Sequence, residues 1–264
     1  MERALTPVGM LCRISERAEH ATRALVQALA EEPRLIGSEE APRTANWADD
    51  LRDARGCLLE AGGQVDDALD ARAFPLLVAG DCSIALTTLA AVRRHRPDAR
   101  VLWLDAHGDF NTPETTESGF LGGMSLAGAV GLWNPGLGAE PFPADRVVLA
   151  GVRDLDAKER ELLERSAATV VGAGLDTLVA VQNALDRSPV YVHLDVDVLD
   201  PEQMPAQFPV PGGLRPDKLY DLLEAVADEC EIVGVEVTAF IDAAHAGTVA
   251  SVLEPVLKEA HVHN

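Results

Sequence analysis

The chain has 264 residues, of which 47% are hydrophobic and 4% aromatic, and its formal net charge is −21. This length suits one large α/β domain or two small ones, and the apolar fraction is enough for a full core built mostly from Ala, Val and Leu. The strong negative charge argues against nucleic acids and anionic membranes as partners, and it otherwise indicates a highly soluble surface.

The cysteines and the hydropathy pattern bear on where the protein works. Cys12, Cys57, Cys82 and Cys230 are scattered and form no paired-spacing zinc motif. We therefore expect reduced cysteines and a cytoplasmic protein. No apolar run approaches the roughly 20 residues of a membrane-spanning helix. Residues 1–10 lack the pattern of a secretory signal.

Apolar runs of strand length alternate along the chain with amphipathic stretches. The predicted strands, rich in Val and Leu as buried parallel strands are, cover residues 7–14 (the weakest), 75–79, 100–105, 146–150, 168–172, 189–195 and 231–237. The predicted helices cover residues 15–31, 47–61, 83–95, 157–166, 175–187, 215–228 and 248–261. This alternation predicts an α/β fold in which helices cover both faces of a parallel sheet, in a single domain over residues 1–264.

Two segments, residues 32–46 and 110–143, do not fit the alternation. The second is long and rich in Gly, Pro, Thr and Asn, and it begins where a predicted strand ends. Ligand sites of open α/β sheets lie beyond the carboxyl ends of strands, so we expect this loop to bind the substrate.

Acidic and imidazole side chains spaced two residues apart follow two of the predicted strands. The first group is Asp105, His107 and Asp109, and the second is Asp195 and Asp197. Residues i and i+2 of a strand point to the same face, so each group can converge. Such groups would repel one another unless cations held them, and the pattern therefore predicts a pair of divalent metals that activates a water molecule.

A third segment, Gly80-Asp81-Cys82-Ser83, also follows an apolar run. The order and spacing of the three segments, from about residue 76 to residue 240, resemble the ureohydrolase superfamily of arginases, agmatinases and formiminoglutamases. The resemblance implies a three-layer α/β/α fold with a mainly parallel, eight-stranded sheet and two manganese ions at the strand ends.

The resemblance also implies which residues hold the two ions. One ion would be bound by Cys82, Asp105, Asp109 and Asp195, and the other by Asp105, His107, Asp195 and Asp197. Cys82 departs from the family, which usually has His at this position. As a ligand, its softer thiolate would shift affinity towards zinc, iron or cobalt. The alternative is that Cys82 is a bystander and that one site is weak or empty.

The loop after the first metal motif resembles the arginase branch more than the agmatinase branch. By this resemblance, Asn111 and Ser118 hydrogen-bond the α-carboxylate of an amino-acid substrate, and Asp156 helps to hold its α-amino group. These side chains have suitable donors and acceptors. The alternative for Asn111 and Asp156 is ordinary turn capping.

The reacting end of the site departs from the arginases at three positions. Gly122 replaces a proton-shuttling His, Ala239 matches a guanidinium-binding Glu, and Pro209 matches a Thr near the guanidinium. A buried guanidinium without its carboxylate is costly, which argues against ordinary arginine as the substrate. Cys82, Gly122 and residues 108–116 together most resemble the branch that hydrolyses Nω-hydroxy-L-arginine in antibiotic biosynthesis, although that branch keeps the Glu.

The resulting hypothesis is hydrolysis of a non-peptide C–N bond in an amino-acid-derived small molecule. Hydrolysis at the (hydroxy)guanidino group of Nω-hydroxy-L-arginine or a relative would yield ornithine and (hydroxy)urea. Asp109 would accept the proton of the attacking water and pass it to the leaving nitrogen. His193 is either an auxiliary acid, a group supporting the metal ligands, or a packed strand histidine.

Two alternatives stay open at this point. One is a metal-dependent deacetylase or formimino hydrolase of the same fold, and the other is a catalytically inactive descendant that binds a ligand or partner. The resemblance also admits a homo-oligomer, because arginases are often trimers or hexamers.

Overall fold

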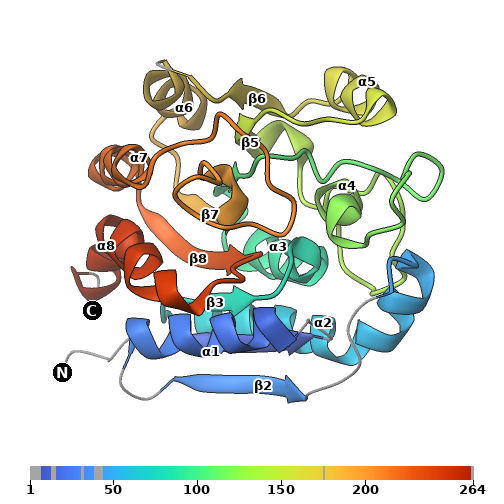
Figure 1. The fold of residues 1–264 in the computed structure, drawn as a ribbon, viewed down its shortest axis with the longest axis horizontal. Coiled ribbons are helices and arrows are strands. Elements are labelled where there is room, and N and C mark those ends of the chain that lie inside the picture. Colours follow the sequence, from blue (N-terminus) through green and yellow to red (C-terminus); the bar gives the residue numbers. More distant parts are fainter. Residues whose placement is uncertain (1–6, 13–15, 31–32, 39–43, 175, 263–264) are drawn as a thin grey trace.

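A single sheet of eight strands organises the fold (Figure 1). The computed structural model describes residues 7–12, 16–30, 33–38, 44–174 and 176–262. The strand order is β2-β1-β3-β8-β7-β4-β5-β6, and each neighbouring pair is parallel. The strands are β1 (Val8–Cys12), β2 (Arg34–Ser38), β3 (Leu76–Ala79), β4 (Arg100–Leu104), β5 (Val147–Val152), β6 (Thr169–Gly172), β7 (Val190–Asp195) and β8 (Ile232–Thr238). The three motifs follow β3, β4 and β7, and β8 lies between β3 and β7. These four strands are therefore adjacent at the centre of the sheet.

Helices cover both faces of the sheet, and the apolar side chains of the strands divide between two cores. The α-helices are α1 (Glu16–Leu29), α2 (Trp47–Asp70), α3 (Ala85–His95), α4 (Ser125–Ala129), α5 (Ala157–Arg165), α6 (Thr177–Leu185), α7 (Pro216–Glu229) and α8 (Ala246–Val262). One core packs α2, α3, α4 and α5 against the sheet, and the other packs α1, α6, α7 and α8 (Figure 1). This confirms the predicted three-layer α/β/α fold.

The predicted elements correspond closely to the observed ones, with three differences. Strand β2 lies within residues 32–46, which the sequence pattern left outside the alternation. Its short sequence Arg-Leu-Ile-Gly-Ser pairs only with β1 at the sheet edge, so it lacks the long apolar run of a central strand. The short helix α4 and the last turns of α2 were also missed.

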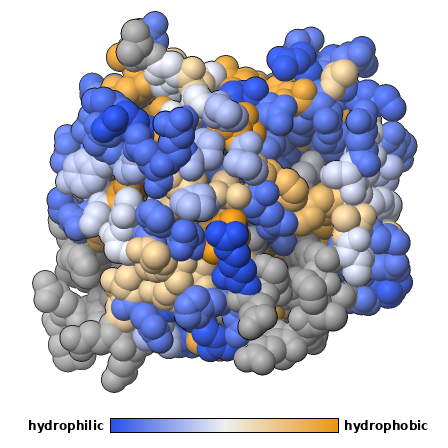
Figure 2. Space-filling view, viewed as in Figure 1, coloured by the Kyte–Doolittle hydropathy of each residue, from blue (hydrophilic) through white to orange (hydrophobic). Residues whose placement is uncertain are grey.

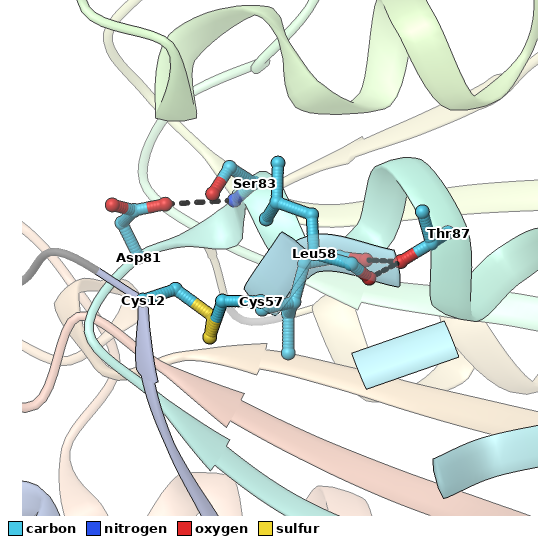
Figure 3. The surroundings of a disulfide bond; sticks show 7 residues. Cys12, Cys57, Leu58, Asp81, Ser83 and Thr87 are labelled. Carbon is cyan, nitrogen blue, oxygen red and sulfur yellow. Dashed lines mark hydrogen bonds between the residues drawn. A yellow bond between two sulfur atoms is a disulfide. The ribbon is translucent and has the colours of Figure 1, made fainter. Parts of the chain in front are cut away.

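Helix α2 continues past its predicted end through Gly62 and Gly63. A β-carbon at Gly62 would approach the β-carbon of Thr87 on α3 to 2.8 Å, so glycine lets the two helices pack closely. The Thr87 hydroxyl donates a hydrogen bond to the Leu58 carbonyl across this contact (Figure 3). Close packing therefore compensates for the low helix propensity of glycine.

The expectation that all cysteines are reduced is wrong for one pair. Cys12, at the end of β1, forms a disulfide with Cys57 of α2 (Figure 3). Cys82 and Cys230 are free and buried. The two bonded residues lie 45 positions apart, so their spacing alone could not pair them. The fold brings them together because α2 packs against β1.

The surface fits the acidic composition. The face in Figure 2 is mostly hydrophilic, with apolar stretches between the polar side chains. Among the helices in the described part of the chain, none combines the length and apolar character needed to cross a membrane.

The disulfide predicts a redox-dependent stability. It closes a loop of 45 residues, which in chain-entropy terms stabilises the fold by about 2–4 kcal/mol. We expect a reductant to lower the free energy of unfolding in urea by about this amount. The Cys57→Ser variant should start at the lower value and be insensitive to the reductant. A thiol count of four in the unfolded protein without reductant would contradict the bond.

Candidate metal centre

The three motif segments share one local structure. Each begins with an aspartate at or just after the end of a strand, and its carboxylate accepts a hydrogen bond from the backbone N–H two residues on. The distances are 2.9 Å from Ser83 N to Asp81, 2.7 Å from His107 N to Asp105 and 2.8 Å from Asp197 N to Asp195. This Asx-type turn ends each strand and turns the following side chains over the sheet edge.

The turns, rather than strand alternation, bring the predicted ligands together. Strand β4 ends at Leu104, so Asp105, His107 and Asp109 lie in the turn itself, and Asp109 has a left-handed backbone with φ of 50°. The i, i+2 argument therefore predicted the convergence correctly but gave the wrong local conformation for this segment. The Asp109 carboxylate is held by the Ser125 hydroxyl, which donates to it over 3.1 Å.

Two groups of side chains are arranged to hold a metal ion. Cys82, Asp105 and His193 form one, and Asp105, His107 and Asp197 form the other, with the ligand atoms of each group within 4.8 Å of one another. Asp105 belongs to both groups, so the two groups share one carboxylate. These N, O and S donors fit divalent transition metals.

Further contacts bind the two groups into one cluster. The Cys82 thiol donates to Asp195 Oδ2 over 3.0 Å, and His107 Nδ1 lies 3.0 Å from Asp197 Oδ2. The Trp103 indole donates to Asp105 Oδ2 over 3.1 Å. In addition, Asp197 accepts from the backbone N–H of Ala106 over 3.1 Å, which joins the segment of Asp105 directly to the segment of Asp195 and Asp197.

Burial and mutual repulsion dominate the electrostatics of this cluster. Burial and the charge of Asp197 raise the pKa of Asp105 to about 6. Burial and neighbouring carboxylates likewise raise the pKa values of Asp109 and Asp195 well above their usual range. Burial and the same acidic neighbours raise the pKa of the Cys82 thiol. Without cations the cluster therefore favours protonated side chains, and bound cations reverse that preference.

His107 responds in the opposite direction. Burial lowers its pKa, but hydrogen bonds to Asp105 and Asp197, together with their charges, outweigh burial and raise the pKa to about 12. Burial acts to raise the pKa of Asp197, but its hydrogen bond with His107 and the imidazolium charge hold that pKa below the ordinary value. The His107 imidazole thus pairs with the carboxylates of Asp105 and Asp197.

A cavity of about 330 Å³ opens over the cluster. It is lined by most of the predicted site residues, namely Cys82, His107, Asp109, Asn111, Ser118, Asp156, Asp195 and Asp197. Asp105 is buried beneath these residues, and His193 is fully buried in β7 and does not line the cavity. The structure therefore brings the predicted ligands and substrate-binding residues together, while their roles stay predictions.

The predicted substrate-binding residues form a connected group. Asn111 Nδ2 donates to Asp156 Oδ2 over 3.1 Å, and Asp156 begins α5 with a capping box completed by Glu159. Ser118 Oγ accepts from Phe120 N over 3.2 Å, which leaves its O–H to donate to a ligand. An amide donor and a carboxylate acceptor side by side fit the carboxylate and ammonium groups of an α-amino acid.

Glu159 is a site residue that the sequence reasoning missed. Its buried carboxylate accepts from Phe110 N over 2.8 Å and from Asp156 N over 3.2 Å, which ties the loop after Asp109 to α5. Burial raises its pKa to about 7. The capping pattern of Asp156 and Glu159 was readable from the sequence, but the contact with Phe110 was not.

Arg153 was also missed. Its guanidinium donates to the backbone carbonyls of Asp197 and Val210, in each case over 2.8 Å from Nη2, and to further carbonyls of Gly151, Val198 and Leu199. It therefore fixes the chain after Asp195 and the segment next to Pro209 on one side of the cavity.

The three positions that depart from the arginase pattern all line the cavity. A β-carbon at Gly122 would approach the Phe120 ring to 2.4 Å, so this ring occupies the space of a side chain at 122. Phe120 in turn packs against Phe208, with ring centroids 5.2 Å apart, next to Pro209. Ala239 has a left-handed backbone with φ of 55° and presents no charge. Among the described residues that line the cavity, none is Lys or Arg.

Comparisons with known proteins agree with this geometry. The Arginase family model matches residues 17–254. The N(omega)-hydroxy-L-arginine amidinohydrolase of Streptomyces lavendulae is 39% identical over 221 residues, covering 84% of this chain and 80% of that protein. The arginase of Brevibacillus brevis is 37% identical over 196 residues, covering 67% of this chain and 66% of that protein. The solved arginase of Bacillus caldovelox superposes with a TM-score of 0.84 at 26% identity, covering 97% of this chain and 98% of that structure.

The raised pKa values predict how metal-free protein responds to pH. The folded state keeps protons on Asp105 to about pH 6 and on Glu159 to about pH 7, whereas in the unfolded chain they dissociate near pH 3.8 and 4.5. The folded state thus binds more protons above pH 4, so stability falls as pH rises. His107 acts in the same direction above its ordinary value of 6.5, because only the folded state keeps it protonated.

We therefore expect the free energy of unfolding of chelator-treated protein to fall between pH 5 and pH 8. Asp105 alone would contribute about 1.4 kcal/mol over this range, because its pKa of about 6 lies one unit above pH 5 and one pKa unit is about 1.4 kcal/mol. Metal-saturated protein should lose the effect, because cations bind the deprotonated ligands. Asp105→Asn is the control. Without metal, its free energy of unfolding should depend less steeply on pH than that of the wild type. Metal-free protein that is more stable at pH 8 than at pH 5 would contradict this account.

Proposed function

Because this chain belongs to the arginase family, we propose that it is a binuclear-metal hydrolase that cleaves a guanidino-type C–N bond of an amino-acid-derived substrate. The substrate is Nω-hydroxy-L-arginine or a close relative, and the products are ornithine and (hydroxy)urea. The observation that carries the proposal is the convergence of the three strand-end motifs on Asp105, which two groups of metal-binding side chains share.

The donor set fits two divalent ions. In this proposal Cys82, Asp105, Asp109 and Asp195 hold one, and Asp105, His107, Asp195 and Asp197 hold the other, with manganese or, because of the thiol, a softer metal such as zinc, iron or cobalt. When bound, the ions lower the pKa of water and polarise the carbon under attack. No strong side-chain base is then needed to generate the nucleophile.

The chain's own residues orient the substrate and move its proton. Asn111 and Ser118 donate to the α-carboxylate, and Asp156 accepts from the α-ammonium group. This places the side chain of the substrate along the cavity towards the cluster. Asp109 lines the cavity, and the Ser125 hydroxyl fixes its carboxylate. Asp109 thus accepts the proton of the attacking water and delivers it to the leaving nitrogen.

The reacting end of the cavity favours a weakly basic group over an ordinary guanidinium. Ala239 supplies no carboxylate, and Phe120 and Phe208 supply apolar surface. A buried guanidinium would lack a charge partner there. A hydroxyguanidine is less basic than a guanidine, so the cost of burying it is smaller. The same observation favours the second candidate, a hydrolase of acyl or formimino amino acids with the same metal centre.

The first test is an assay of manganese-loaded protein with Nω-hydroxy-L-arginine and L-arginine in parallel. We expect ornithine and hydroxyurea from the first substrate and little urea from the second. Asp105→Ala should reduce the rate by at least about 100-fold, because bound metal contributes several kcal/mol to the transition state.

Either negative outcome of that assay is informative. No ornithine from protein with two metals bound would contradict the amidinohydrolase function, and acetyl and formimino amino acids would then be tested. No product from any of them would leave a binding protein of the same fold. Cytoplasmic location, homo-oligomerisation and a place in antibiotic biosynthesis stay predictions.

The Ala239→Glu variant tests the reacting end directly. Position 239 lines the cavity and already carries a β-carbon in its left-handed conformation, so the longer side chain adds no new class of backbone strain. A carboxylate there gives a guanidinium its partner, and we expect kcat/KM for L-arginine to rise about 10-fold, in line with a charged hydrogen bond. Ala239→Gln has the same shape without the charge and should not show this gain. Equal kcat/KM values for L-arginine in the two variants would contradict the idea that a missing carboxylate at position 239 disfavours arginine.

A further inference from the structure

His193 lies behind the cavity. It belongs to neither of the two ligand sets that the family resemblance implies. The register places it beside Trp103 of β4 and Glu236 of β8, so the three residues form one row across adjacent strands. His193 is fully buried, as are Trp103 and Glu236. In this position it cannot reach a substrate in the cavity, and its effect on the site must pass through the cluster.

One side of the His193 ring is held by a carboxylate. Nδ1 lies 2.6 Å from Glu236 Oε1, and Tyr191 donates its hydroxyl to Glu236 Oε2 over 2.9 Å. The Trp103 ring stacks on the imidazole with a centroid distance of 3.5 Å and an interplanar angle of 5°. The ring is therefore fixed in both plane and rotation. The carboxylate favours the tautomer with the proton on Nδ1.

The other ring nitrogen points at the cluster. Nε2 lies 3.4 Å from the Thr238 hydroxyl, which is itself 3.1 Å from the Cys82 thiol. Among the described residues this hydroxyl is the one hydrogen-bonding neighbour of Nε2, and the distance is long for a hydrogen bond. With the proton on Nδ1, Nε2 carries the free lone pair, on the side of the ring where Thr238 and Cys82 lie.

This arrangement is the one that supports a metal-binding histidine. Such a residue donates its second N–H to a carboxylate, which orients the ring and makes the coordinating nitrogen more basic. Here the carboxylate is Glu236, and Tyr191 saturates its remaining oxygen. A histidine buried only for packing has no need of this support, or of a ring nitrogen within 4.8 Å of both a thiol and a carboxylate oxygen.

We propose that His193 Nε2 is a metal ligand, and that it completes with Cys82 and Asp105 a thiolate–imidazole–carboxylate site beside the oxygen-rich site of Asp105, His107 and Asp197. This inference rests on the metal centre of the proposed function. His193 on β7 thus supplies an imidazole in place of the one that the family usually has at the position of Cys82. The two sites differ in softness, so the Cys82 site prefers zinc or cobalt, and the other also accepts manganese.

X-ray absorption of wild-type protein loaded with two equivalents of zinc tests the assignment without a variant. Each site contributes one imidazole, so we expect about one imidazole per zinc on average and sulfur from one thiolate per two zinc ions. An average of about half an imidazole per zinc, as from His107 alone, would overturn the proposal even if every His193 variant failed to fold. Wild-type protein that binds no metal would instead contradict the proposed function.

Variants provide the second readout, through equilibrium metal binding and the absorption of the cobalt form. His193→Gln should weaken one of the two binding steps by at least about 10- to 100-fold and shift the thiolate-to-cobalt band without abolishing it. Glu236→Gln keeps the ligand but removes its support, and should weaken the same step while the imidazole count stays unchanged. Cys82→Ser should abolish the thiolate band, and His107→Gln should weaken the other step. A folded His193→Gln protein with wild-type affinities and spectrum would overturn the proposal.

Discussion

The mutual repulsion of buried carboxylates is the constraint on which the rest of this site depends. Asp105, Asp109, Asp195 and Asp197 are all at most 5% exposed and lie within one cluster. In the metal-free protein, protonation and the imidazolium of His107 relieve that repulsion only in part. Two divalent cations would offset the remaining repulsion, which is why a cluster that is costly in isolation suits the proposed metal centre.

The sheet makes the cluster possible by placing the strand ends side by side. β3, β8, β7 and β4 are neighbours, and the aspartates at the ends of β3, β4 and β7 each cap the backbone two residues on. These hydrogen bonds satisfy backbone donors that the sheet no longer pairs. Two of these carboxylates, those of Asp105 and Asp195, are also proposed metal ligands, so local structure and the proposed chemistry depend on the same side chains.

Whether a feature of the fold or the site could be predicted depends on how far apart in the sequence the interacting residues lie. The central strands and most helices were predicted because their apolar patterns are local, and the convergence of the motif side chains because neighbouring members are two residues apart. Strand β2 was missed because an edge strand needs little apolar sequence. The Cys12–Cys57 bond and the contact of His193 with Glu236 join positions 45 and 43 residues apart. Pairings of this kind depend on strand register and helix packing, which a single sequence does not reveal.

The altered positions of the site are best understood together. Gly122, Pro209 and Ala239 line the same cavity, and the space beside Gly122 is filled by Phe120, which packs on Phe208 next to Pro209. Random decay would leave voids and would also erode the carboxylates, which are expensive to keep buried without cations. Here Phe120 fills the space beside Gly122, the carboxylates are intact and Arg153 still fixes the backbone around Asp197. The pattern therefore supports the proposal of a changed substrate end beside a retained metal centre, rather than the loss of that centre.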